Sequence, residues 1–132
     1  MAVEVHVVTP EREVWSGDAE MVVARGTEGE VGILAGHAPM LVRLAIGALR
    51  IIREGGEQEA AVVDGGFLHV VSRGQTTRAD VLAAHAEMVH EIDVRVAEFR
   101  AEQARRRLDD IEDVGAQAEL AKALARIHLA GP

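Results

Sequence analysis

The sequence predicts an antiparallel β-sandwich over residues 1–84, followed by a hairpin of two helices over residues 85–132. Up to Ala84, apolar residues alternate with polar ones and glycines interrupt the chain, which is typical of short strands joined by tight turns. From His85 onward glycine is rare and apolar residues recur three and four apart, which indicates amphipathic helices. No stretch of helical length separates the strands, so parallel βαβ units are excluded and the strands must close on each other, as a β-sandwich or a barrel.

The first strand is expected at residues 3–7, where three valines alternate with Glu4 and His6. Successive side chains of a strand point to opposite faces, so the valines share one apolar face. Glycines separate five further apolar segments, at residues 19–24, 49–52, 60–63, 67–71 and 77–82.

The first helix is expected to bury an apolar stripe. Apolar residues spaced by three and four positions lie on one face of a helix, and that face packs against a neighbour. The stripe consists of Val89, Ile92, Val96 and Phe99.

The second helix has larger apolar residues on one side, with alanines beside them that let a neighbouring helix approach closely. The acidic connector at residues 109–115 suits the N-terminus of this helix, where the helix dipole favours negative charge. Two helices joined by so short a turn fold back as a hairpin. The larger residues are Leu120, Leu124 and Ile127, and the alanines are Ala118, Ala121 and Ala125.

Composition excludes several classes of function. Twenty-two acids against fourteen bases give a net charge of −8, and aromatic residues make up only 2%. Neither property suits a nucleic-acid partner, which requires positive charge and exposed rings. The absence of cysteine excludes disulfides, thiolate nucleophiles and Cys-ligated zinc. The longest uncharged run, residues 31–42, is too short to span a bilayer, so no direct membrane insertion is expected.

No catalytic or metal-binding motif is expected. The six histidines form no H-E-x-x-H, Ser16 and Ser72 lack the G-x-S-x-G context, and no phosphate-binding glycine loop occurs. An enzyme that uses His37 and Glu30 as a proton-transfer pair remains an alternative, although it has no third group to orient the pair. A free-standing binding module with a regulatory helix pair is another.

A glycine-rich segment carries the most specific signal. Residues 29–39 read G-E-V-G-I-L-A-G-H-A-P, followed later by D-G-G-F-L at residues 64–68 and A-E-L-A-K-A-L-A at residues 118–125. This order of features resembles the epsilon subunit of bacterial rotary F-type ATP synthases, from Val3 to about Leu129. One departure is Ala35, where many relatives have proline.

The resemblance implies a non-catalytic accessory subunit. Such a subunit belongs to the central stalk, couples proton-driven rotation of the c-ring to ATP synthesis through gamma, and is peripheral at the cytoplasmic face of the bacterial plasma membrane. The sandwich is then expected to dock on gamma and the c-ring. The segment from Glu28 to Pro39 would face the ring, with Glu30 as the contact. His37 either contacts the ring or satisfies backbone groups of its own segment.

The resemblance also implies that the helical hairpin inhibits ATP hydrolysis. In an extended state it would bring some of Arg105, Arg106 and Arg107 to an acidic segment of the catalytic beta subunits. The alternative is that the three arginines are solvated charges, and Glu102 and Arg106 have the spacing of a favourable ion pair on a helix.

Some relatives bind ATP through I/L-D-x-x-R-A at the start of the first helix, with help from basic residues of the second. Here residues 92–97 read I-D-V-R-V-A, so Asp93 matches while Arg95 lies one residue early, about 100° around the helix. Asp93 can also serve as a helix cap. Lys122 and Arg126 could face a phosphate or form a solvated stripe. ATP binding is therefore expected to be weak or absent, and no other cofactor is expected.

Overall fold

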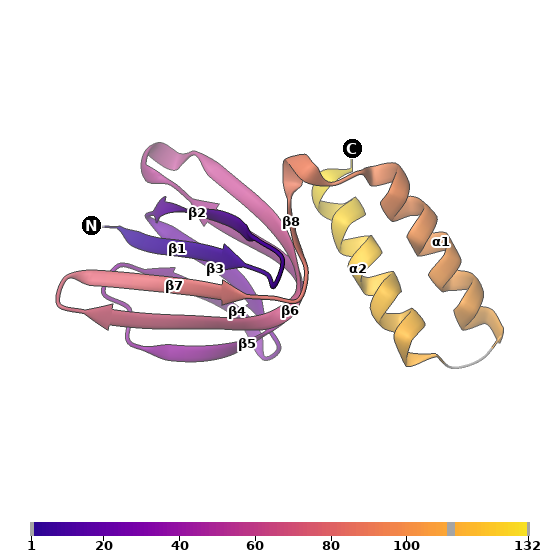
Figure 1. The fold of residues 1–132 in the computed structure, drawn as a ribbon, viewed down its shortest axis with the longest axis horizontal. Coiled ribbons are helices and arrows are strands. Elements are labelled where there is room, and N and C mark those ends of the chain that lie inside the picture. The colour runs from indigo at the N-terminus through magenta and orange to yellow at the C-terminus, as the bar shows by residue number, and fades with distance from the viewer. Residues whose placement is uncertain (1, 111–112, 132) are drawn as a thin grey trace. The chain divides into compact units, whose positions relative to one another are not determined.

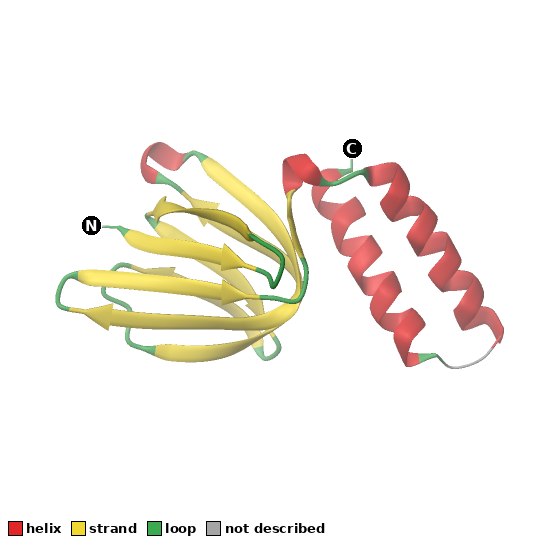
Figure 2. Cartoon of the chain, in the orientation of Figure 1, coloured by secondary structure: helices red, strands yellow, loops and turns green. Residues whose placement is uncertain are grey.

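The computed structural model describes residues 2–110 and 113–131. The chain forms two compact units that meet between Met88 and Val89 (Figure 1). Strands make up the first unit and helices the second, apart from one short turn of helix in the first (Figure 2). Sequence periodicity placed the division at residue 84. The structure adds a short strand after that point, so the contacts divide the chain four residues later.

The described part of the first unit contains an eight-stranded sheet in the order β2-β1-β7-β6-β5-β3-β4, with β8 also paired to β6. The long strands β5 and β6 bend through both layers of the sandwich, which confirms the predicted fold class (Figure 1). The strands are β1 (Val3–Val8), β2 (Glu13–Ala19), β3 (Met21–Gly26), β4 (Gly29–Leu34), β5 (Met40–Ile52), β6 (Gln58–Arg73), β7 (Thr76–Leu82) and β8 (Ala86–Met88), and the 3₁₀ turn η1 (Glu54–Gly56) joins β5 to β6.

One strand pair departs from the predicted antiparallel pattern. β1 and β7 run parallel, with Val3 opposite Thr77 and Val7 opposite Val81. Parallel neighbours need a long crossover between them. Here the strands β2 to β6 supply it in place of a helix, so the absence of βαβ units did not exclude a parallel pair.

The core of the sandwich contains the side chains that the alternation of the first strand predicted. Val3, Val5 and Val7 are fully buried and pack with inward residues of the other strands. The largest of these partners are Ile33, Leu49, Ile51, Leu68 and Met88.

Two boundaries of the predicted strands are wrong. The segment 19–24 was expected to be one strand, but β2 ends at Ala19 and β3 begins at Met21. The glycine-rich segment at residues 29–39 was not among the expected strands, yet it contains β4. Its glycines obscure the alternation, in which Ile33 is buried and Val31 is half-buried. β4 pairs with β3 as an antiparallel hairpin.

The second unit begins with a 3₁₀ turn, η2 (Val89–Glu91), followed by α1 (Val94–Asp110) and α2 (Val114–Ala130). Each α-helix has 17 residues, about 25 Å in length. The two helices pack side by side, which confirms the predicted hairpin (Figure 1). Asp93 Oδ1 accepts hydrogen bonds from the backbone N–H groups of Arg95 and Val96, so it caps α1 as expected.

The apolar stripe predicted for the first helix is wrong. Val89 and Ile92 precede α1, while Val96 and Phe99 are 41% and 64% exposed. The buried residues of α1 are instead alanines, and α2 contributes two more from positions outside the predicted set. Small side chains let the two helix backbones approach closely, and Val96 and Phe99 lie outside the contact. The buried alanines are Ala97, Ala101, Ala104, Ala116 and Ala123.

Candidate docking surfaces

The turn between β3 and β4 presents acidic side chains to solvent. Glu28 lies in the turn itself, and Glu30 lies on β4 opposite Arg25 of β3. All three side chains are exposed. Gly29 has φ +134°, a conformation that L side chains rarely adopt, so the tight turn depends on this glycine.

His37 lies in the turn that follows β4, where hydrogen bonds hold the backbone to β6 and β7. The hydroxyl of Ser72 donates to the His37 carbonyl (2.7 Å), and the Gly36 N–H donates to the buried hydroxyl of Thr77 (2.7 Å). His37 Nδ1 lies 2.7 Å from the carbonyl oxygen of Ala38. The ring of His37 therefore satisfies a backbone group of its own turn.

The structure separates Glu30 and His37, which the resemblance placed in one segment facing the c-ring. Glu30 stands near the start of β4 and His37 follows its end at Leu34, and that part of the strand alone spans roughly 13 Å. Glu28 and Glu30 thus form one acidic turn, and His37 belongs to another. The proposed proton-transfer pair of His37 and Glu30 has no geometric basis.

Sequence reasoning missed an apolar patch on the outer face of the sheet. Phe67 of β6 lies opposite Leu82 of β7 on one side and opposite Arg43 of β5 on the other. Leu41 lies two residues from Arg43 on β5, so its side chain points to the same face as that of Arg43. Leu41, Phe67 and Leu82 therefore share a face, and they are 67%, 42% and 48% exposed. We call these three residues the outer patch. Alternation alone shows which residues share a face but not which face is covered.

A charged cluster lies on the same side of the sheet, across β1, β2 and β7. His6 Nδ1 is 2.9 Å from Glu13 Oε1, and His6 Nε2 is 3.4 Å from Glu4 Oε2. Arg78 binds Asp80 at 3.1 Å and Glu4 at 3.5 Å. The hydrogen bond from His6 lowers the pKa of Glu13 below its usual value.

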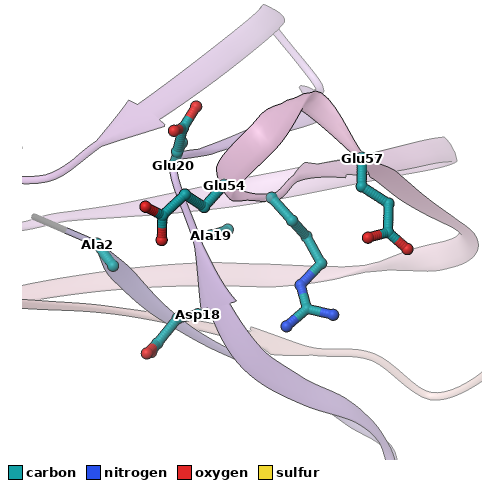
Figure 3. A pocket seen from close by; sticks show the side chains of 7 residues that line it. Ala2, Asp18, Ala19, Glu20, Glu54 and Glu57 are labelled. Atoms are coloured by element: carbon teal, nitrogen blue, oxygen red, sulfur yellow. The ribbon is translucent and has the colours of Figure 1, made fainter.

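A cavity of about 550 Å³ opens beside η1. Figure 3 shows carboxylates of Asp18, Glu54 and Glu57 around it, and Arg53 also contributes to its lining. The Arg53 guanidinium lies 5.7 Å from the centre of the Trp15 ring. Across the described residues, no group of three or more His, Asp or Glu side chains has the geometry of a metal site.

The three consecutive arginines of α1 are exposed and have different neighbours. Arg106 pairs with Glu102 one turn earlier (3.3 Å), which confirms the ion pair expected from the spacing. Arg107 binds Asp113, the cap of α2, at 2.9 Å. Within the described part of the chain, Arg105 contacts no acidic side chain. Its side chain is exposed.

The residues considered for nucleotide binding lie towards one end of the hairpin. Asp93 and Arg95 are at the start of α1, Lys122 is in the middle of α2 and Arg126 is in its second half. Lys122 pairs with Glu119 at 3.4 Å. Arg126 is buried and donates to the Lys122 carbonyl oxygen (3.0 Å), so Arg126 is not part of a solvated stripe.

Among the described residues, no helix is long and apolar enough to cross a membrane.

The profile of a family described as the beta-sandwich domain of the ATP synthase Delta/Epsilon chain matches residues 2–87. This match covers the whole of the sandwich from β1 into β8. The fold and the match together define the class: a delta- or epsilon-type chain of ATP synthase.

Relatives that match over nearly the whole chain narrow this class. The ATP synthase epsilon chain of Chromohalobacter salexigens is 40% identical, over 92% of this chain and 86% of its own length. That of Thermobifida fusca is 42% identical, over 96% of this chain and 90% of its own. That of Legionella pneumophila strain Corby is 43% identical, over 97% and 93%. The chain belongs to the ATP synthase epsilon chain family, whose members are non-catalytic subunits of that complex.

Solved structures agree with this assignment. A chain in the cryo-EM structure of the Euglena gracilis mitochondrial ATP synthase superposes with a TM-score of 0.75 at 28% identity, over 92% of this chain and 76% of that one. A chain in the central stalk and c-ring structure of the Tetrahymena thermophila enzyme gives a TM-score of 0.59 at 19% identity, over 98% and 94%. The second likeness concerns the fold alone.

Proposed function

We propose that this chain is part of the central stalk of a bacterial F-type ATP synthase, where it couples rotation of the c-ring to ATP synthesis through gamma and inhibits ATP hydrolysis through α1 and α2. The observation that carries the proposal is similarity to epsilon chains along both the sandwich and the helical hairpin. In this proposal the chain is a peripheral subunit at the cytoplasmic face of the plasma membrane.

Gamma docks on the outer patch in this proposal. The three apolar side chains of the outer patch are exposed together on one face of the sheet. Burying them would remove apolar area from water, which is the main source of association energy. The charged cluster around His6 and Arg78 forms the polar rim expected beside such a patch.

The c-ring contacts the acidic turn formed by Glu28 and Glu30. The turn projects from the end of the β3–β4 hairpin, and its carboxylates are exposed. Exposed ion pairs contribute little energy and weaken with salt, so this contact orients the subunit more than it binds it. His37 lies outside this turn and supports the backbone instead.

The helical hairpin regulates ATP hydrolysis when Arg105, Arg106 and Arg107 meet acidic side chains of the catalytic beta subunits. All three arginines are exposed on α1. The hairpin contact is built from alanines, which bury little apolar area. A hairpin held in this way can change its arrangement at a modest free-energy cost.

Nucleotide binding to the hairpin is weak or absent in this proposal. Arg95 is displaced by one position from the family pattern, and the side chain of Arg126 is buried on α2. Lys122 is paired with Glu119. No further cofactor is invoked.

Removal of everything after His90 tests the regulatory part. The sandwich unit ends at Met88, so the truncated chain keeps all eight strands. The complex should then assemble normally and hydrolyse ATP faster than the intact complex. Replacing Arg105, Arg106 and Arg107 together by alanine should give part of the same increase. Equal rates of hydrolysis with the intact and the truncated chain would contradict the proposed inhibition.

A further inference from the structure

The carboxylate of Asp113 links the last turn of α1 to the start of α2. Asp113 Oδ2 accepts hydrogen bonds from Arg107 Nη2 (2.9 Å) and Arg107 Nε (3.3 Å). Asp113 Oδ1 accepts the backbone N–H of Ala116 (2.9 Å), which caps α2. Oδ1 therefore caps the N-terminus of α2, and Oδ2 binds the Arg107 side chain of α1.

Glycine at position 115 keeps the space beside this contact uncrowded. A Cβ atom on Gly115 would lie 3.2 Å from Asp113 Oδ1 and 3.5 Å from Arg107 Nη2. The hydrogen bond from the Ala116 N–H, followed by that from Arg107, lowers the pKa of Asp113. The carboxylate is therefore ionised at neutral pH and attracts the guanidinium.

The three arginines differ in what holds them. Arg107 is bound by a carboxylate of the other helix, and the exposed fractions of the two side chains are 52% and 26%. Arg106 is bound by its own helix through Glu102, with exposed fractions of 69% and 54%. Of these two contacts, only that of Arg107 links α1 to the start of α2.

We propose that Asp113 is an internal competitor for Arg107, occupying its guanidinium while the start of α2 lies against α1 and releasing it to a carboxylate of a partner subunit when the two helices separate there. This inference rests on the proposed inhibition by the hairpin. Asp113 occupies the position that the partner's carboxylate would take. Its contact with Arg107 therefore opposes the inhibitory action of the hairpin. Because Asp113 is tethered close to Arg107, a partner in solution or in the complex must overcome its high effective concentration.

The substitution Asp113→Asn separates the two roles of the side chain. Asparagine caps helices about as well as aspartate, so α2 still begins at the same residue. It no longer carries the charge that holds Arg107. The loss of this charge favours inhibition in two ways. The start of α2 separates from α1 more readily, and the guanidinium of Arg107 is free. Glu119→Gln is the matched control, because it removes the same charge from the same helix at an exposed pair with Lys122.

The experiment compares ATP hydrolysis by complexes that contain the full-length chain with Asp113→Asn, Arg107→Ala, both changes together, or Glu119→Gln. We expect Asp113→Asn to lower hydrolysis by about twofold, the size expected for an exposed ion pair. The effect of Asp113→Asn should vanish in the Arg107→Ala background, and Glu119→Gln should leave the rate unchanged. An unchanged rate with Asp113→Asn, or an equal decrease in the Arg107→Ala background, would overturn the proposal.

Amide hydrogen exchange of the full-length chain alone separates this failure from a failure of the proposed function. Exchange in the first turn of α2 should be faster in Asp113→Asn than in the wild type, and high salt should accelerate only the wild type. If exchange responds in this way and truncation after His90 raises hydrolysis, but Asp113→Asn leaves hydrolysis unchanged, the competition is wrong while the regulation stands. If truncation has no effect on hydrolysis, the regulation itself fails, and the competition with it.

Discussion

At the level of single residues, two carboxylates are held in their charged form by hydrogen bonds. The pKa of Glu13 is lowered by its hydrogen bond with His6, and the pKa of Asp113 by those from the Ala116 N–H and Arg107. A carboxyl group whose pKa is lower in the folded state stabilises that state above its unfolded pKa. This stabilisation is lost as the pH falls through the folded pKa.

Glu13→Gln should therefore change how stability depends on pH. The wild type should exceed the variant in free energy of unfolding at about pH 5, and the difference should shrink as the pH falls below the usual Glu value of 4.5. Chemical denaturation of both proteins across this range measures the difference. Glu11→Gln, at an exposed position of the preceding turn, is the control. A difference between wild type and Glu13→Gln that stays constant down to about pH 3 would contradict the assigned hydrogen bond.

Several residue roles could be predicted from sequence because they depend on local spacing. Asp93 as a cap and the pair of Glu102 with Arg106 follow from positions within one turn of helix, and both are confirmed. The pairing of Arg107 with Asp113 could not be predicted, because it depends on how the chain reverses between two helices.

At the level of elements, the helical hairpin is held by alanines. Periodicity predicts two helices and their hairpin correctly, but it ranks faces by hydrophobicity and so selected Val96 and Phe99. The face that packs is instead the one whose small side chains permit a close approach, with Ala97 and Ala101 buried. The same limit explains β4, where glycines conceal a strand whose partner is provided by the fold.

Ala101→Leu should destabilise the helical hairpin. Ala101 is 1% exposed, and a leucine there would force the helices apart at a cost of about 1–3 kcal/mol. Phe99→Ala, on the exposed face of the same helix, should change stability by no more than about 0.5 kcal/mol. Thermal unfolding followed by far-UV circular dichroism compares the two. A larger loss with Phe99→Ala than with Ala101→Leu would show that the predicted stripe, and not the alanine face, carries the contact.

At the level of the whole molecule, the fold class follows from sequence but the surfaces do not. Alternation and glycine spacing indicate a sandwich, and the burial of the three valines of β1 confirms the expected inner face. The parallel pairing of β1 with β7 joins segments more than seventy residues apart, which no local pattern encodes. The outer patch arises from the antiparallel pairing of β5, β6 and β7, which places Leu41, Phe67 and Leu82 together.

In the proposed function, this outer patch attaches the chain to gamma. Leu41 is 67% exposed, so Leu41→Asp should leave the sandwich folded while placing a charge in the proposed interface. Glu30→Lys, on the separate acidic turn, is the control and should retain gamma.

The most direct measurement is purification of the tagged full-length chain from cells that express the whole complex, followed by quantification of gamma and beta. The wild type and Glu30→Lys should recover both subunits, whereas Leu41→Asp should recover on the order of tenfold less gamma. Absence of gamma from the wild-type preparation, or equal recovery with Leu41→Asp, would contradict the claim.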